Sequence, residues 1–108
     1  RYVTPTRTFA RLGGEEFALI DIQPAFATSE ALCEDLRGAI AAIMPRAPGG
    51  ARLPVTASIG LKGFDRPIGV TEAMQATDAL LYRAKHEGRN RVEACSPKAA
   101  GSAGQRAA

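Results

Sequence analysis

The sequence contains no tryptophan, only two cysteines and a single histidine. Cys33 and Cys95 match the spacing of no zinc or redox motif; two thiols do not settle the compartment, but neither requires an oxidising one. No hydrophobic run approaches the roughly 20 residues of a membrane span, and no signal peptide opens the chain. The net charge of +3 is too small by itself to indicate nucleic-acid binding.

What remains is typical of one small globular domain. Hydrophobic residues make up 45% and charged residues 23% of the 108 positions. The first residue is Arg1 rather than Met, and we therefore expect a piece of a longer protein. From Ser96 onward Ala, Gly, Ser, Pro and Lys/Arg dominate. The prediction is a domain over residues 1–95 and a disordered tail over 96–108.

Hydrophobic periodicity and turn residues predict six elements in the order strand, strand, helix, strand, helix, strand. The two-residue Gly13-Gly14 connection suits a primed hairpin turn, which needs positive φ. The predicted elements are strands 9–12 and 15–20, helix 29–44 (capped by Thr28 or Ser29 and stopped by Pro45), a strand within 55–64, a helix from the Thr71 cap to Glu87 with Gly88 beyond it, and strand 90–94. This order predicts an α/β fold (an α+β sandwich), a mainly antiparallel sheet covered by helices.

Two adjacent acids, Glu15 and Glu16, follow the glycine pair Gly13 and Gly14 at the hairpin tip. Hard carboxylate oxygens bind Mg²⁺ together with substrate phosphates, and glycines let a nucleotide approach the backbone closely. The tip is therefore a candidate magnesium–phosphate site. The spacing alone favours the alternative, a solvated hairpin tip whose acids serve solubility.

A second, basic cluster occupies residues 82–92 at the end of the last predicted helix. Lys85 and Arg89 are four positions apart across the helix end, so they are candidates for a shared phosphate group. Cations near a helix C-terminus also complement the helix dipole, which is the alternative explanation. A nucleic-acid-binding role is disfavoured, because only Tyr82 supplies an aromatic ring near these charges.

Three stretches together resemble one family. "ARLGGEEFALI" is similar to the signature of GGDEF domains, the diguanylate cyclases of bacterial signalling, in its GGEEF variant. "VTASIG" and "TDALLYRAKHEGRNRV" are similar to that family's following strand and its last helix and strand. The resemblance covers residues 7–93 and implies a palm-like fold of which this chain is the C-terminal part. The N-terminal elements, with a metal-binding Asp and the guanine-reading residues, are absent from the sequence.

The resemblance implies a role for each matching residue. Gly13 and Gly14 match the turn under the guanine nucleotide, and Glu15 matches a ligand of Mg²⁺ (or Mn²⁺) and the proposed general base. Glu16 matches a second essential acid, and Lys85 and Arg89 match side chains that hold the triphosphate. The implied reaction joins two GTP molecules into cyclic di-GMP across a homodimer and releases pyrophosphate. The resemblance also implies that an upstream sensory domain regulates this reaction. A non-catalytic GGDEF-like nucleotide-binding or signalling module is the alternative.

The chain departs from the family pattern in three places. Thr4 and Arg7 stand where many members have the Arg and Asp of an R-x-x-D product-inhibition site, so that site is expected to be absent. Leu80 replaces the usual small Ala of the last helix, and Thr77 replaces the Ala before Asp78. Both of these changes are expected to alter packing only.

Overall fold

All six expected elements are present in the computed structural model, which describes residues 4–23 and 25–97. The mixed α/β class is confirmed, with one antiparallel and one parallel strand pair among these residues. In chain order the elements are β1 (Arg7–Gly13), β2 (Glu16–Asp21), α1 (Phe26–Ala41), β3 (Ile59–Lys62), α2 (Val70–His86) and β4 (Val92–Cys95).

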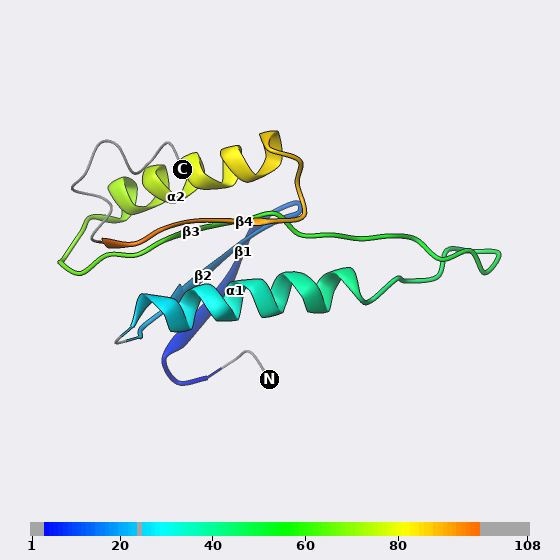
Figure 1. Ribbon diagram of the computed structural model, residues 1–108, viewed down its shortest axis with the longest axis horizontal. Coiled ribbons are helices and arrows are strands. Elements are labelled where there is room, and N and C mark those ends of the chain that lie inside the picture. The colour runs from blue at the N-terminus through cyan, green and yellow to red at the C-terminus, as the bar shows by residue number, and fades with distance from the viewer. Residues whose placement is uncertain (1–3, 24, 98–108) are drawn as a thin grey trace.

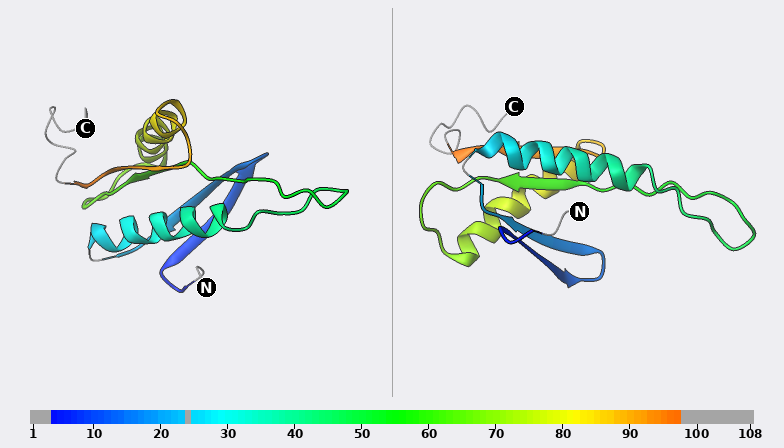
Figure 2. Two further views of the ribbon diagram at one scale, coloured as in Figure 1. Left: turned by 45° about the vertical axis from the view of Figure 1, so that its right-hand side comes forward. Right: turned by 90° about the horizontal axis from the view of Figure 1, so that it is seen from below.

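The parallel pair β3–β4 forms the centre of the fold, with α1 and α2 on opposite faces (Figures 1 and 2). Its register runs from Ile59 opposite Val92 to Lys62 opposite Cys95. Helix α2 connects the two strands, because a parallel pair needs a crossover that returns to the same end of the sheet. At Gly60 the strand lies so close to α2 that an added Cβ would be 2.4 Å from the Leu81 amide nitrogen.

The hairpin β1–β2 is antiparallel, and its turn differs by one residue from the expected turn. Gly13 pairs with Glu16, and the register shifts between Arg11 and Gly13. The two loop residues are therefore Gly14 and Glu15, rather than Gly13 and Gly14. The glycines still serve the expected purpose, since Gly13 has φ 145° and Gly14 has φ 52°.

Helix α1 begins earlier and ends earlier than residues 29–44. The N-cap is Ala25, which makes no side-chain capping bond, and Ala42 is the C-cap. Ser29 is instead buried within the helix, where its hydroxyl donates to the Asp21 carboxylate at 2.8 Å. The expected cap at Thr28 or Ser29 is wrong because this tertiary hydrogen bond employs the serine.

Helix α2 also begins before its expected cap. Gly69 is the N-cap and makes no side-chain capping bond, so Thr71 lies within the first turn, followed by Glu72. The helix ends at His86, and Gly88 follows the Glu87 C-cap with φ 126°. The glycine thus occupies the expected left-handed position after the helix.

Residues 42–58, which we call the arm, project from the body between α1 and β3 (Figure 1). A single antiparallel bridge joins Arg46 to Arg52, and the Leu53 amide donates to the Pro45 carbonyl at 2.8 Å. The expected strand within 55–64 is therefore shorter, because regular pairing with β4 begins only at Ile59.

The core of the described residues is small. Its buried apolar side chains are Cys33, Leu80 and Ala84. Burial raises the pKa of the Cys33 thiol to about 11, so this cysteine is a neutral packing group. The hairpin contributes little to the core, since Phe9 and Phe17 are both more than half exposed. The expected disordered tail lies mostly outside the described residues.

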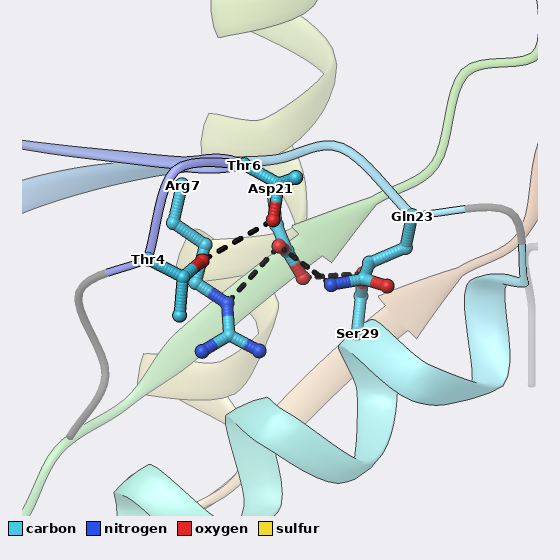
Figure 3. Close-up of polar contacts among 6 residues, drawn as sticks. All are labelled: Thr4, Thr6, Arg7, Asp21, Gln23 and Ser29. Carbon is cyan, nitrogen blue, oxygen red and sulfur yellow. Dashed lines mark hydrogen bonds and ion pairs between the residues drawn. The ribbon is translucent and has the colours of Figure 1, made fainter.

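A polar network fixes the open end of the hairpin to α1 (Figure 3). The Asp21 carboxylate accepts hydrogen bonds from Arg7 Nε at 3.1 Å, Gln23 Nε2 at 3.1 Å and Ser29 Oγ at 2.8 Å. Burial opposes ionisation of Asp21, but these donors outweigh it and lower the pKa of the carboxyl group. The hairpin is therefore anchored at its base, and the glycine turn lies at its other end.

Candidate active site at the hairpin tip

The hairpin tip is built so that its glycines face open space. Arg11 stabilises the turn, because its Nε and Nη2 atoms donate to the Gly14 carbonyl at 3.2 and 3.0 Å. A Cβ added at Gly13 or Gly14 would meet no atom within 4 Å among the described residues. A flat or bulky ligand can therefore approach the backbone of this turn.

Glu16 connects the tip to the second cluster. Its Oε2 atom lies 3.6 Å from Lys85 Nζ, so the acidic turn lies beside the C-terminal part of α2. Both side chains are partly exposed, and such a pair contributes at most about 1 kcal/mol to stability. Its value is positional: the contact brings an acid and a base from distant parts of the sequence to one place.

Glu15 lies in the turn itself and is exposed. Within the part of the chain that the structure describes, its carboxylate makes no hydrogen bond or ion pair. It is therefore free to bind a cation or to accept a proton. Of the two predicted acids, Glu16 is held by Lys85 and Glu15 projects from the turn.

Arg89 is not brought to Lys85 in the way that the sequence spacing suggests. The helix ends at His86, and Arg89 follows on a left-handed turn with φ 61°. Its amide donates to the Ala84 carbonyl at 2.9 Å, while its side chain is exposed. The two cations therefore belong to the same end of α2, but the described residues show no shared partner for them.

Two residues near this turn were missed by the sequence reasoning. Arg37 of α1 donates from Nη1 to the Asn90 side-chain oxygen at 2.7 Å, across 53 positions of sequence. The Asn90 amide donates to Ser58 Oγ at 3.2 Å. The only sequence signal is Asn90 itself, since Asn after Gly-Arg favours a left-handed turn.

The acids at the tip have the donor chemistry of a magnesium site. Mg²⁺ usually keeps several waters and binds one or two carboxylates together with substrate phosphates. Glu15 and Glu16 supply two such carboxylates on adjacent residues. Among the described residues no group of three or more His, Cys, Asp or Glu side chains is close enough to form a metal site. The pair thus fits a metal that is shared with a phosphate ligand.

Comparison with known proteins gives the family of this chain. The model of the family described as "Diguanylate cyclase, GGDEF domain" matches residues 1–91. The chain belongs to the GGDEF family. The family match spans the hairpin tip and the turn at Arg89, the two parts of the candidate site.

Curated relatives and solved structures agree with this family. The chain is 38% identical over 84 residues to the diguanylate cyclase DgcP of Pseudomonas aeruginosa, covering 78% of the chain and 12% of that protein. It is 35% identical over 86 residues to DgcM of Escherichia coli K12, covering 76% of the chain and 19% of that protein. It is similar to the GGDEF domain of Caulobacter crescentus DgcB in complex with c-di-GMP, with TM-score 0.74 and 32% identity over 84% of the chain.

The GGDEF chain is much shorter than the proteins it matches. It spans 54% of the DgcB domain structure and 49% of a second DgcB structure that includes a coiled coil, with TM-score 0.75 and 30% identity. Its share of the curated relatives is smaller still. Over the described residues, neither helix has the length and apolar character to cross a membrane.

Proposed function

We propose that the protein carrying this chain condenses two GTP molecules into cyclic di-GMP with release of pyrophosphate. The observation that carries the proposal is the Glu16–Lys85 contact in a chain of the GGDEF family. This contact brings the acidic hairpin tip and the basic cluster of residues 82–92 to one place. An acidic group for metal-assisted chemistry and a cation for phosphate thus lie side by side. These are complementary parts of a nucleoside triphosphate site.

Each residue of the site has a specific task in this proposal. The open backbone at Gly13 and Gly14 supports the guanine nucleotide, and Lys85 and Arg89 neutralise its triphosphate. Glu15 accepts the proton of the ribose 3′-hydroxyl as the 3′-oxygen bonds to the α-phosphorus of the other GTP. The bond from that phosphorus to pyrophosphate breaks in the same displacement.

Glu15, assisted by Glu16, would hold Mg²⁺ or Mn²⁺ at the tip. When bound, such an ion neutralises charge on the phosphate oxygens and on the leaving pyrophosphate. The protein's own contribution is the alignment of the two carboxylates with the cations of α2 and its following turn. Substrate phosphates would compete with Glu16 for Lys85, and the released Glu16 carboxylate would then be available to assist Glu15.

The reaction needs two GTP molecules in opposed orientation, so we propose that two copies of the domain meet as a homodimer. Control by a sensory domain upstream and a cytoplasmic location belong to the same proposal. They are supported by the family match and by the small share of the relatives that this chain spans.

The test is an assay for cyclic di-GMP with the full-length protein, GTP and Mg²⁺. Glu15→Ala and Glu16→Ala should each abolish the product, because loss of a metal-binding carboxylate removes several kcal/mol of transition-state stabilisation, on the order of 3 or more. Glu72→Ala, an exposed acid at the opposite end of α2, is the matched control and should retain activity. Wild-type rates in either tip variant, or GTP binding without any product, would overturn the proposal and favour a non-catalytic module.

A further inference from the structure

The turn that carries Arg89 has an unusual backbone. Gly88, Arg89 and Asn90 have φ values of 126°, 61° and 48°, three consecutive left-handed residues. Glycine adopts such angles without strain and asparagine tolerates them, whereas arginine is strained in this region. The turn therefore needs contacts from outside to keep this shape.

Those contacts come from three elements. The Arg89 amide donates to the Ala84 carbonyl of α2, and the Asn90 amide donates to Ser58 Oγ at the end of the arm. The Asn90 side chain accepts a hydrogen bond from Arg37 Nη1 of α1 at 2.7 Å. Arg37 supplies the only charged donor of the three, and such hydrogen bonds are about twice as strong as neutral ones.

Arg37 is itself held in place. Its Nε atom donates to both carboxylate oxygens of Glu34 at 3.0 Å, and its Nη2 atom makes a further short contact with the same group. These hydrogen bonds lower the pKa of Glu34 and raise that of Arg37. The fork of the guanidinium is thereby oriented with Nη1 toward Asn90.

We propose that Arg37 is a positioning residue: through Asn90 it fixes the turn that directs Arg89 at the triphosphate. The proposal rests on the proposed function, because it assumes that Arg89 binds GTP phosphates. It assigns a part in substrate binding to a residue of α1, outside the two clusters that the sequence predicted. Arg37 itself does not need to contact the nucleotide.

The experiment measures GTP and GMP binding to the full-length protein by calorimetry in the presence of Mg²⁺. Arg37→Ala should weaken GTP binding about tenfold, the equivalent of one charged contact, and leave GMP binding unchanged. Asn90→Gly, which removes the acceptor but allows the same backbone angles, should give the same loss. Arg46→Ala on the arm removes an equal charge from an exposed position and should change neither affinity.

A double-mutant cycle separates positioning from a general structural effect. If Arg37 acts through Arg89, adding Arg37→Ala to Arg89→Ala causes no further loss of GTP affinity. Additive losses, or wild-type affinity in Arg37→Ala and Asn90→Gly, would overturn the positioning role. Wild-type protein that binds GTP without forming cyclic di-GMP would overturn only the proposed function, and absence of GTP binding would overturn both.

Discussion

At the scale of single residues, the acids and cations of this chain divide between anchoring and chemistry. Asp21 accepts three hydrogen bonds and holds the hairpin to α1, whereas Glu15 makes no polar contact among the described residues. The sequence identified Glu15 and Glu16 because acids beside a glycine turn are conspicuous. It could not identify Asp21 or Arg37, because their partners are selected by tertiary packing and leave no local pattern.

Asp21→Asn should lower the free energy of unfolding by about 2 kcal/mol, because a hydrogen-bonded carboxylate is lost. The pKa of Asp21 is lowered in the folded chain, so its contribution is fully present above the ordinary value of 3.8. It is lost as the pH falls below 3.8 through the lower folded pKa. Urea unfolding of both proteins across pH 2–7 measures this, with exposed Asp65→Asn as the control. A constant difference between the two proteins down to the lowest pH would contradict the prediction.

The family resemblance puts Arg7 at the aspartate position of the product-inhibition motif, and in the structure Arg7 binds Asp21. Arg7→Ala should therefore destabilise the hairpin base without changing the affinity for cyclic di-GMP. Calorimetric titration with cyclic di-GMP provides the measurement, and unfolding of the same samples shows the loss of stability. Tight cyclic di-GMP binding that disappears in Arg7→Ala would show that this position still forms a product site.

At the scale of elements, periodicity predicted every helix and strand, but several ends were misplaced. Both helices begin at residues without a side-chain capping bond, Ala25 and Gly69, so no capping signal marked the true starts. The strand within 55–64 was too long because alternation of apolar residues continues into the arm, where no strand of the described residues pairs with it. Element ends thus depend on tertiary partners that periodicity does not contain.

The contact between β3 and α2 predicts a sharp difference between two glycines. In Gly60→Ala the new methyl group would overlap backbone atoms of Thr77 and Leu81, and stability should fall by about 2–3 kcal/mol. Gly38→Ala in α1 faces open space and should raise stability by up to about 1 kcal/mol. Chemical denaturation compares the two variants with wild type. Equal effects of the two substitutions would contradict the close packing of β3 on α2.

At the scale of the whole molecule, much of the hairpin is uncovered in the described chain. Its large apolar side chains are exposed on both strands: Phe9, Leu12, Phe17 and Ile20. Strands β1 and β2 pair only with each other among the described residues, which leaves edges open to further pairing. The family resemblance predicted this open region, because it implied that further elements belong to the sheet.

The 108-residue chain by itself should not cyclise GTP and should self-associate. Its described residues supply two carboxylates and two cations, too few to align both nucleotides, and unoriented binding contributes little rate. Exposed apolar strands favour association at raised concentration. Sedimentation velocity and a cyclic di-GMP assay on the purified chain measure both properties. A monomeric chain with turnover that Glu15→Ala abolishes would contradict this expectation.

The arm links two parts of the chain that pack against each other in the fold. Toward its far end its backbone hydrogen bonds, such as those from Ala47 to Ala51 and from Leu53 to Pro45, lie within the arm. The hairpin and α1 precede it, and the β3–α2–β4 unit follows it. Loops of this kind change length at little thermodynamic cost. Insertions, or new termini made by circular permutation, near Gly49 and Gly50 should leave the hairpin tip and the Arg89 turn in place. The end of the arm is therefore a natural place for the insertion of another domain.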